Sequence, residues 1–241
     1  MSDIRATFIE KQERIYGEIA AKRAEVLVHG IRPEVHYRNR RGAFSIALLH
    51  SSHVAETFSS VSRMIATCVP AVVYPPCNIH TTLYIARMPA PFLYNPHDSE
   101  HQTILRTLVQ ATGASFAERK PRVCCIEYSR YFLTQEAVLA PGEPDNAFVE
   151  MVDLLSVNCE KLGVVGNPAW GAHATVSRFT AQKPASDLGA LLKLLERSPV
   201  VGTSVCTKIA VGYSLWGPSP ECPHPAEVHG HFVPYRTFSI V

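Results

Sequence analysis

Two segments of the chain carry the same pattern around a histidine, and the residue types in that pattern can transfer protons. The segments are IHTTL at 79–83 and AHATV at 172–176, which align without a gap at an offset of 93 residues. Each reads apolar, His, any residue, Thr, apolar. A histidine followed two residues later by Ser or Thr also occurs at His50, His97 and His101, but only the two segments have apolar residues on both flanks.

The spacing suits a strand that is polar on one face and apolar on the other. Side chains two residues apart on a β-strand point to the same face, so His80 and Thr82 would share one face, and His173 and Thr175 would share a face of the second strand. Two imidazoles facing one cleft form a general acid and base pair, because a histidine pKa near ~6.5 lets one ring be neutral while the other is protonated. The threonine hydroxyls can hydrogen bond to phosphoryl oxygens. This chemistry needs no metal ion and no other cofactor.

The paired motifs resemble those of the two-histidine (2H) phosphoesterase superfamily, which includes bacterial RNA 2′,5′-ligase-like proteins and cyclic nucleotide phosphodiesterases. The resemblance covers residues 43–240 in motif positions and order of elements. It implies an α+β fold, bilobal and pseudo-twofold, in which two antiparallel sheets face a central cleft with helices outside. The catalytic set that it carries over is His80, Thr82, His173 and Thr175.

The same resemblance implies a reaction class. We expect a metal-independent phosphodiesterase that hydrolyses 2′,3′-cyclic phosphate or 2′,5′-phosphodiester bonds of nucleotides or short RNA ends. Two alternatives stay open: RNA 2′,5′-ligation or end transfer by the same residues, and a nucleotide-binding module without turnover. The sequence does not assign the acid and base roles to the two histidines.

Three further residues are candidates for substrate binding. Tyr84 lies two residues after Thr82, and Trp170 lies just before the second motif, so either ring could stack on a base or pack in the core. Arg178, five residues after His173, matches a common position of the superfamily. Strict strand alternation gives Arg178 the parity opposite to His173, so its side chain has either a phosphate-binding role or a salt bridge away from the cleft.

One other cluster could bind a metal ion. Histidine and cysteine are zinc ligands, and the cluster comprises Cys222, His224, His229 and His231. Its spacing matches no familiar zinc pattern, so a metal-dependent hydrolase is a minor alternative and the expected metal content is none.

The motifs must be positioned by a mixture of helices and strands. Apolar residues at 54, 58, 61 and 65 repeat at spacings of four, three and four, which is typical of an amphipathic helix. The expected helices span residues 4–28, 54–65, 99–112, 145–162 and 187–196. The expected strands span residues 43–49, 78–88, 122–128, 131–136, 172–179, 204–211 and 232–240, with a turn at the PGEP sequence of 141–144. We expect an N-terminal helical extension at 1–30 and a single bilobal domain at 31–241.

Composition limits the remaining possibilities. The chain has 241 residues, 46% of them apolar and 18% charged, which is typical of a globular protein with a sizeable core. A formal net charge of +2 does not favour wrapping of long nucleic acid. Seven cysteines without a framework spacing indicate free thiols in a reducing compartment. With no apolar segment at the N-terminus and no run long enough to cross a bilayer, we expect a cytoplasmic monomer without membrane contact.

Overall fold

A computed structural model of the protein describes residues 2–34, 43–86, 95, 97–198, 201–217 and 229–240. The α-helices are α1 (Ser2–Ala21), α2 (Arg23–His29), α4 (Ser52–Cys68), α5 (Ser99–Glu118), α6 (Asn146–Lys161) and α7 (Gly189–Arg197), with short 3₁₀ turns η1 (Pro76–Asn78) and η2 (Ala185–Asp187). The strands are β1 (Ala43–Leu49), β2 (His80–Ala86), β3 (Cys124–Tyr128), β4 (Phe132–Leu133), β5 (Ala137–Pro144), β6 (Gly166–Pro168), β7 (Ala172–Arg178), β8 (Gly202–Cys206), β9 (Lys208–Gly217) and β10 (His229–Ser239).

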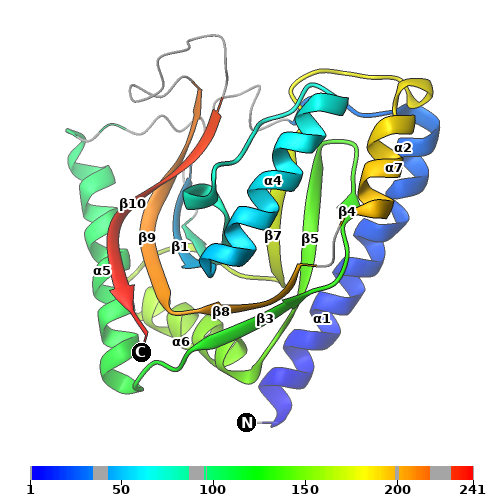
Figure 1. The fold of residues 1–241 in the computed structure, drawn as a ribbon. Coiled ribbons are helices and arrows are strands. Elements are labelled where there is room, and N and C mark those ends of the chain that lie inside the picture. The colour runs from blue at the N-terminus through cyan, green and yellow to red at the C-terminus, as the bar shows by residue number, and fades with distance from the viewer. Residues whose placement is uncertain are drawn as a thin grey trace.

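The described strands form one curved antiparallel sheet with the order β10-β9-β1-β2-β7-β5-β3-β8, to which β6 adds beside β2 and β4 beside β5 (Figure 1). The sheet has two halves, β10-β9-β1-β2 and β7-β5-β3-β8. They meet at the two motif strands, where β2 and β7 pair only at Thr81 and Ala174. The predicted α+β class is confirmed, and the two expected sheets are the halves of one continuous sheet.

The helices cover the outer faces of the two halves. α5 contacts β1 and β9 of the first half, α4 contacts β7 and β8 of the second half, and α6 contacts strands of both halves (Figure 1). The predicted apolar face of the helix at 54–65 is confirmed, since Val54, Phe58, Val61 and Ile65 of α4 are fully buried. The main core lies between these helices and the sheet.

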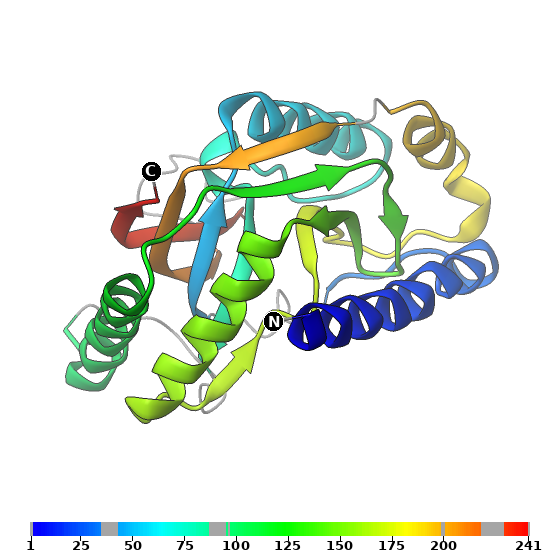
Figure 2. The same ribbon diagram turned by 90° about the horizontal axis from the view of Figure 1, so that it is seen from below.

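The N-terminal helical segment predicted at 4–28 is two helices. α2 ends at Gly30, whose φ of +78° is the left-handed conformation that favours glycine, and whose N–H donates to Val26 O. Ile31 and Lys183 then exchange backbone hydrogen bonds of 2.9 and 3.0 Å. Figure 2 shows α1 running beside β4 at the edge of the second half.

The turn predicted at residues 141–144 is wrong, because these residues form the end of β5. Pro141 lies opposite His173 on β7, and Pro144 lies opposite Ile126 on β3. Proline and glycine favour turns when local preference decides. Here pairing with strands on both sides outweighs that preference, so a turn-like sequence lies inside the sheet.

Candidate active site

The two motif strands meet at equivalent residues. Thr81 and Ala174 lie opposite each other, and they are separated by the same 93 residues as the two histidines. The pseudo-twofold axis of the motif pair therefore passes through this contact. Thr81 also donates a hydrogen bond of 3.1 Å from its hydroxyl to His173 O, which ties the two motifs together.

The four motif residues gather on one face of the sheet. Thr81 and Ala174 are fully buried on the core side, so strand alternation places His80 and Thr82, like their counterparts on β7, on the opposite face. All four are half-buried: His80, Thr82, His173 and Thr175. Antiparallel pairing through the central contact puts each histidine beside the threonine of the other motif.

Each histidine ring is oriented by a carbonyl two residues earlier. His80 Nδ1 lies 2.7 Å from Asn78 O, and His173 Nδ1 lies 3.3 Å from Gly171 O. A carbonyl can only accept, so Nδ1 carries the proton in both rings and Nε2 is the basic nitrogen. The two motifs thus present the same tautomer in the same local geometry.

An aromatic ring packs against each imidazole. Phe232 of β10 lies 4.6 Å from the His80 ring, tilted by 37°. Trp170 stacks on His173 at 4.2 Å with an angle of 20° between the rings. One face of the Trp170 ring therefore covers His173, whereas the sequence suggested that this ring could stack on a nucleotide base. Phe232 is a residue of the candidate site that the motif pattern does not reveal.

Burial keeps both histidines neutral in the free protein. It lowers the pKa of His173 to about 4, and the positive charges of Arg178 and of protonated His80 act in the same direction, against the hydrogen bond to Gly171 O. Burial also lowers the pKa of His80, with Arg178 adding to the effect and the hydrogen bond to Asn78 O opposing it. An incoming anion would raise both pKa values, because it stabilises the protonated imidazole.

Both motif strands contain a β-bulge at the third residue after the histidine. On β2 the register passes from Thr82 to Tyr84 and skips Leu83, and on β7 it passes from Thr175 to Ser177 and skips the equivalent valine. A bulge adds one residue and reverses the alternation beyond it. The repeated bulge is a further element of the pseudo-twofold symmetry.

The first bulge corrects the predicted place of Tyr84. Its side chain points away from the face of His80 into the core, where it is 3% exposed and its hydroxyl donates to Val164 O at 2.9 Å. Burial raises the pKa of Tyr84 to about 12. Tyr84 therefore supports β2 from behind and does not line the candidate site.

The second bulge returns Arg178 to the face of His173. Strict alternation gave Arg178 the opposite face, but Arg178 lies beyond the bulge. It pairs with Ala137 of β5, and Thr175 pairs with Leu139. Ala137 and Leu139 share one face of β5, so Arg178 and Thr175 share that face too. Arg178 Nη1 lies 3.3 Å from an oxygen of Glu34, whose side chain is 3% exposed. The predicted salt bridge of Arg178 is therefore present, on the face of the motifs and not away from it, and its charge acts on the pKa of both histidines.

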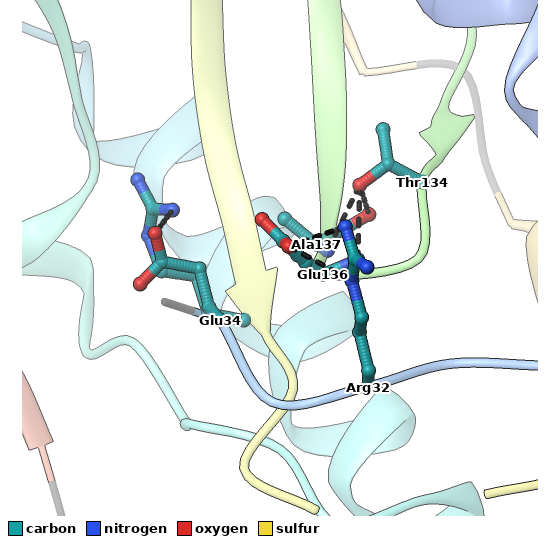
Figure 3. A network of polar contacts seen from close by, with 6 residues as sticks. Arg32, Glu34, Thr134, Glu136 and Ala137 are labelled. Atoms are coloured by element: carbon teal, nitrogen blue, oxygen red, sulfur yellow. Dashed lines mark hydrogen bonds and ion pairs between the residues drawn. The ribbon is translucent and has the colours of Figure 1, made fainter. Parts of the chain in front are cut away.

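The connector that carries Glu34 is fixed by a neighbouring ion pair (Figure 3). Arg32 Nη2 lies 2.9 Å from an oxygen of Glu136, and Thr134 hydrogen bonds to the backbone of residues 136 and 137. Glu34 N–H donates to Phe179 O at 3.1 Å. The segment before residue 35 is therefore anchored against the end of β7, next to Arg178.

A buried polar network lies on the core side of the motif pair. His50 Nε2 lies 3.2 Å from the Thr81 hydroxyl, which also contacts the Tyr128 hydroxyl at 2.9 Å. His50 Nδ1 lies 3.0 Å from the Ser204 hydroxyl. Because the single Thr81 proton goes to His173 O, a neutral His50 with its proton on Nε2 satisfies both contacts. Burial, with a smaller contribution from His80, lowers the pKa of His50 to about 3.

In the described part of the chain, no group of three or more His, Cys, Asp or Glu side chains could hold a metal ion. Cys222, His224 and the side chains of His229 and His231 lie outside the described residues. Six cysteines of the described ranges are free thiols, as expected. Among the described helices, none has the length and apolar character needed to cross a membrane.

Comparison with known proteins rests on structure. No family profile and no curated protein matches the sequence. TT0787 of Thermus thermophilus is 15% identical, with a TM-score of 0.50 over 82% of this chain and 97% of its own. ATU0111 of Agrobacterium tumefaciens, described as a conserved protein of unknown function, is 11% identical, with a TM-score of 0.51 over 87% and 97%. E. coli LigT complexed with 3′-AMP is 11% identical, with a TM-score of 0.48 over 84% and 98%. The α+β fold of this chain is therefore similar to the folds of TT0787 and ATU0111.

Proposed function

We propose that the protein is a metal-independent 2H phosphoesterase that acts on 2′,3′-cyclic phosphate or 2′,5′-phosphodiester bonds of nucleotides or short RNA ends. The observation that carries the proposal is the equivalence of the two histidines. Each is half-buried, each has Nδ1 on the carbonyl two residues earlier, and each leaves Nε2 as the basic atom. Such a pair suits a reaction in which one group removes a proton while the other supplies one.

The reaction proceeds by in-line attack of water on phosphorus. One imidazole takes the proton of the water as the new oxygen–phosphorus bond forms, and the other gives its proton to the ribose oxygen as the old bond breaks. Thr82 and Thr175 donate hydrogen bonds to the non-bridging oxygens, where negative charge develops. For end transfer, a second hydroxyl replaces the water and each histidine keeps its role, whereas in the reverse, ligating direction the roles of the histidines exchange.

The protonated histidine arises when substrate binds. In the free protein burial and Arg178 hold both imidazoles neutral near pH 7. A phosphodiester monoanion between the rings favours protonation of one of them, so binding takes up about one proton. The modest net charge of +2 supports short substrates held by local donors over long RNA.

A substrate panel with matched variants tests the proposal. The panel contains 2′,3′-cyclic mononucleotides, ADP-ribose cyclic phosphate, 2′,5′-linked oligonucleotides and RNA ending in a cyclic phosphate, each assayed with excess chelator. We expect hydrolysis of at least one compound, with His80→Gln and His173→Gln each lowering turnover about 10²–10⁴-fold. His53→Gln is the control, because His53 is exposed on α4. Wild-type turnover in either motif variant, or loss of all activity with chelator, would refute the mechanism, and tight binding without turnover would favour the binding module.

A further inference from the structure

The N-terminal helix reaches the strand that carries the second histidine. Tyr16 of α1 is 3% exposed, and its hydroxyl lies 3.0 Å from Ala172 O and 3.2 Å from Gly142 O. The same hydroxyl accepts a hydrogen bond of 3.1 Å from Gly142 N–H. Gly142 and Ala172 lie opposite each other on β5 and β7, so a side chain of α1 provides hydrogen bonds at the end of this strand pair.

Gln12, one turn earlier on α1, supplies the remaining contact. Its side-chain oxygen accepts a hydrogen bond of 2.8 Å from Ala172 N–H, and Gln12 is 1% exposed. A side chain at Gly171 would come within 3.1 Å of Gln12 Cγ and 3.4 Å of the Tyr16 ring. Gly171 is the residue whose carbonyl faces His173 Nδ1, so α1 packs directly on the backbone that orients this ring.

The same helix supports the aromatic ring on His173. Tyr16 contacts Trp170 edge to face at 5.8 Å, and Trp170 stacks on the imidazole. Tyr16 also packs edge to face on Phe132 at 5.5 Å, in a cluster that includes Leu139. Leu139 lies opposite Thr175 on the neighbouring strand, so this cluster stands on the catalytic face of the second half.

We infer that α1 is a component of the active site, in which Gln12 and Tyr16 are positioning residues for His173. They fix both backbone groups of Ala172 and hold Trp170 against the imidazole, so the ring keeps one orientation while its Nε2 faces the substrate. The inference rests on the proposed function for its effect on catalysis. General acid and base transfer requires a hydrogen-bond geometry that a shift of about 1 Å disrupts.

Two substitutions in the full-length chain test this role. Tyr16→Phe removes the hydroxyl and keeps the ring packing, and Gln12→Ala removes the acceptor of Ala172 N–H. We expect each to lower kcat about 10- to 100-fold, with a smaller change in KM. The NMR resonances of the His173 ring, assigned by their loss in His173→Gln, should shift because the ring current of Trp170 changes, while those of His80 stay in place.

Phe8→Leu is the matched control. Phe8 packs on Phe148 of α6, with ring centres 6.0 Å apart, and belongs to a different apolar cluster from Tyr16 and Trp170. The inference is overturned if both positioning variants lose no more turnover than Phe8→Leu and leave the His173 resonances unchanged. If Tyr16→Phe does not fold, Gln12→Ala decides. If no compound in the panel is turned over, the proposed function fails, whereas the His173 resonances still decide whether α1 positions this ring.

Discussion

Replacement of His173 by glutamine should remove a defined part of the acid sensitivity of the fold. In the unfolded chain the histidine pKa is near ~6.5, whereas burial lowers the pKa of His173 in the folded protein to about 4. The unfolded state therefore binds more protons below about pH 6.5, and the free energy of unfolding decreases as pH is lowered. The contribution of neutral His173 to stability is complete above its pKa in the unfolded chain, and it is lost as pH falls through its pKa in the folded protein.

The magnitude follows from the two pKa values. At pH 5 the unfolded imidazole is largely protonated and the folded one is still neutral, which lowers the free energy of unfolding by about 2 kcal/mol relative to pH 7. Below pH 4 the loss reaches about 3 kcal/mol. His173→Gln does not titrate, so its free energy of unfolding should fall by about 2 kcal/mol less than that of the wild type between pH 7 and pH 5.

Urea unfolding at several pH values between 7 and 5 measures this difference. Other histidines, including His50 with a pKa of about 3, contribute to both proteins, so the comparison isolates His173. His53→Gln, on the exposed face of α4, is the control for the replacement of a histidine. Parallel curves for wild type and His173→Gln would show that the second motif histidine is as solvated in the folded protein as in the unfolded chain, which would refute the burial argument.

Two other predictions concern the contacts between strands. Thr81→Val keeps the side-chain shape but removes the hydrogen bond to His173 O and leaves buried partners unsatisfied. The free energy of unfolding measured in urea should therefore fall by about 1–3 kcal/mol. An unchanged midpoint would contradict the proposed link between the motifs. Gly142→Ala would bring a side chain within 2.5 Å of Ala172 O, and should lower stability by about 2 kcal/mol, whereas Gly113→Ala, inside α5 with open space around it, should raise stability by about 0.5–1 kcal/mol.

The face shared by the motif residues could be predicted because it depends on local periodicity. Strand alternation over three residues places the side chains of His80 and Thr82 on the same face, and the second motif repeats this arrangement. Long-range contacts decide only how the two strands pair. Alternation alone puts Tyr84 and Arg178 on the wrong faces for one shared reason. Each lies beyond a bulge, and residue counting fails once a strand contains an extra residue.

The supports of the two histidines could not be predicted, because they come from opposite ends of the chain. Next to the first motif, Phe232 of β10 packs on His80, and its N–H donates to the side chain of Asn78, 154 residues away. At the second motif the position equivalent to Asn78 is a glycine, and Gln12, 160 residues from its partner Ala172, fills that space. Nothing in the local sequence signals either contact.

This difference gives the pseudo-twofold site an asymmetry that bears on the acid and base roles. His80 depends on a C-terminal strand and a 3₁₀ turn, whereas His173 depends on α1 through Trp170 and the backbone of residues 171 and 172. A change in α1 should therefore act on one proton transfer and spare the other. Because the proposed hydrolysis would need both transfers in one step, a helix that orients only His173 could still control the overall rate.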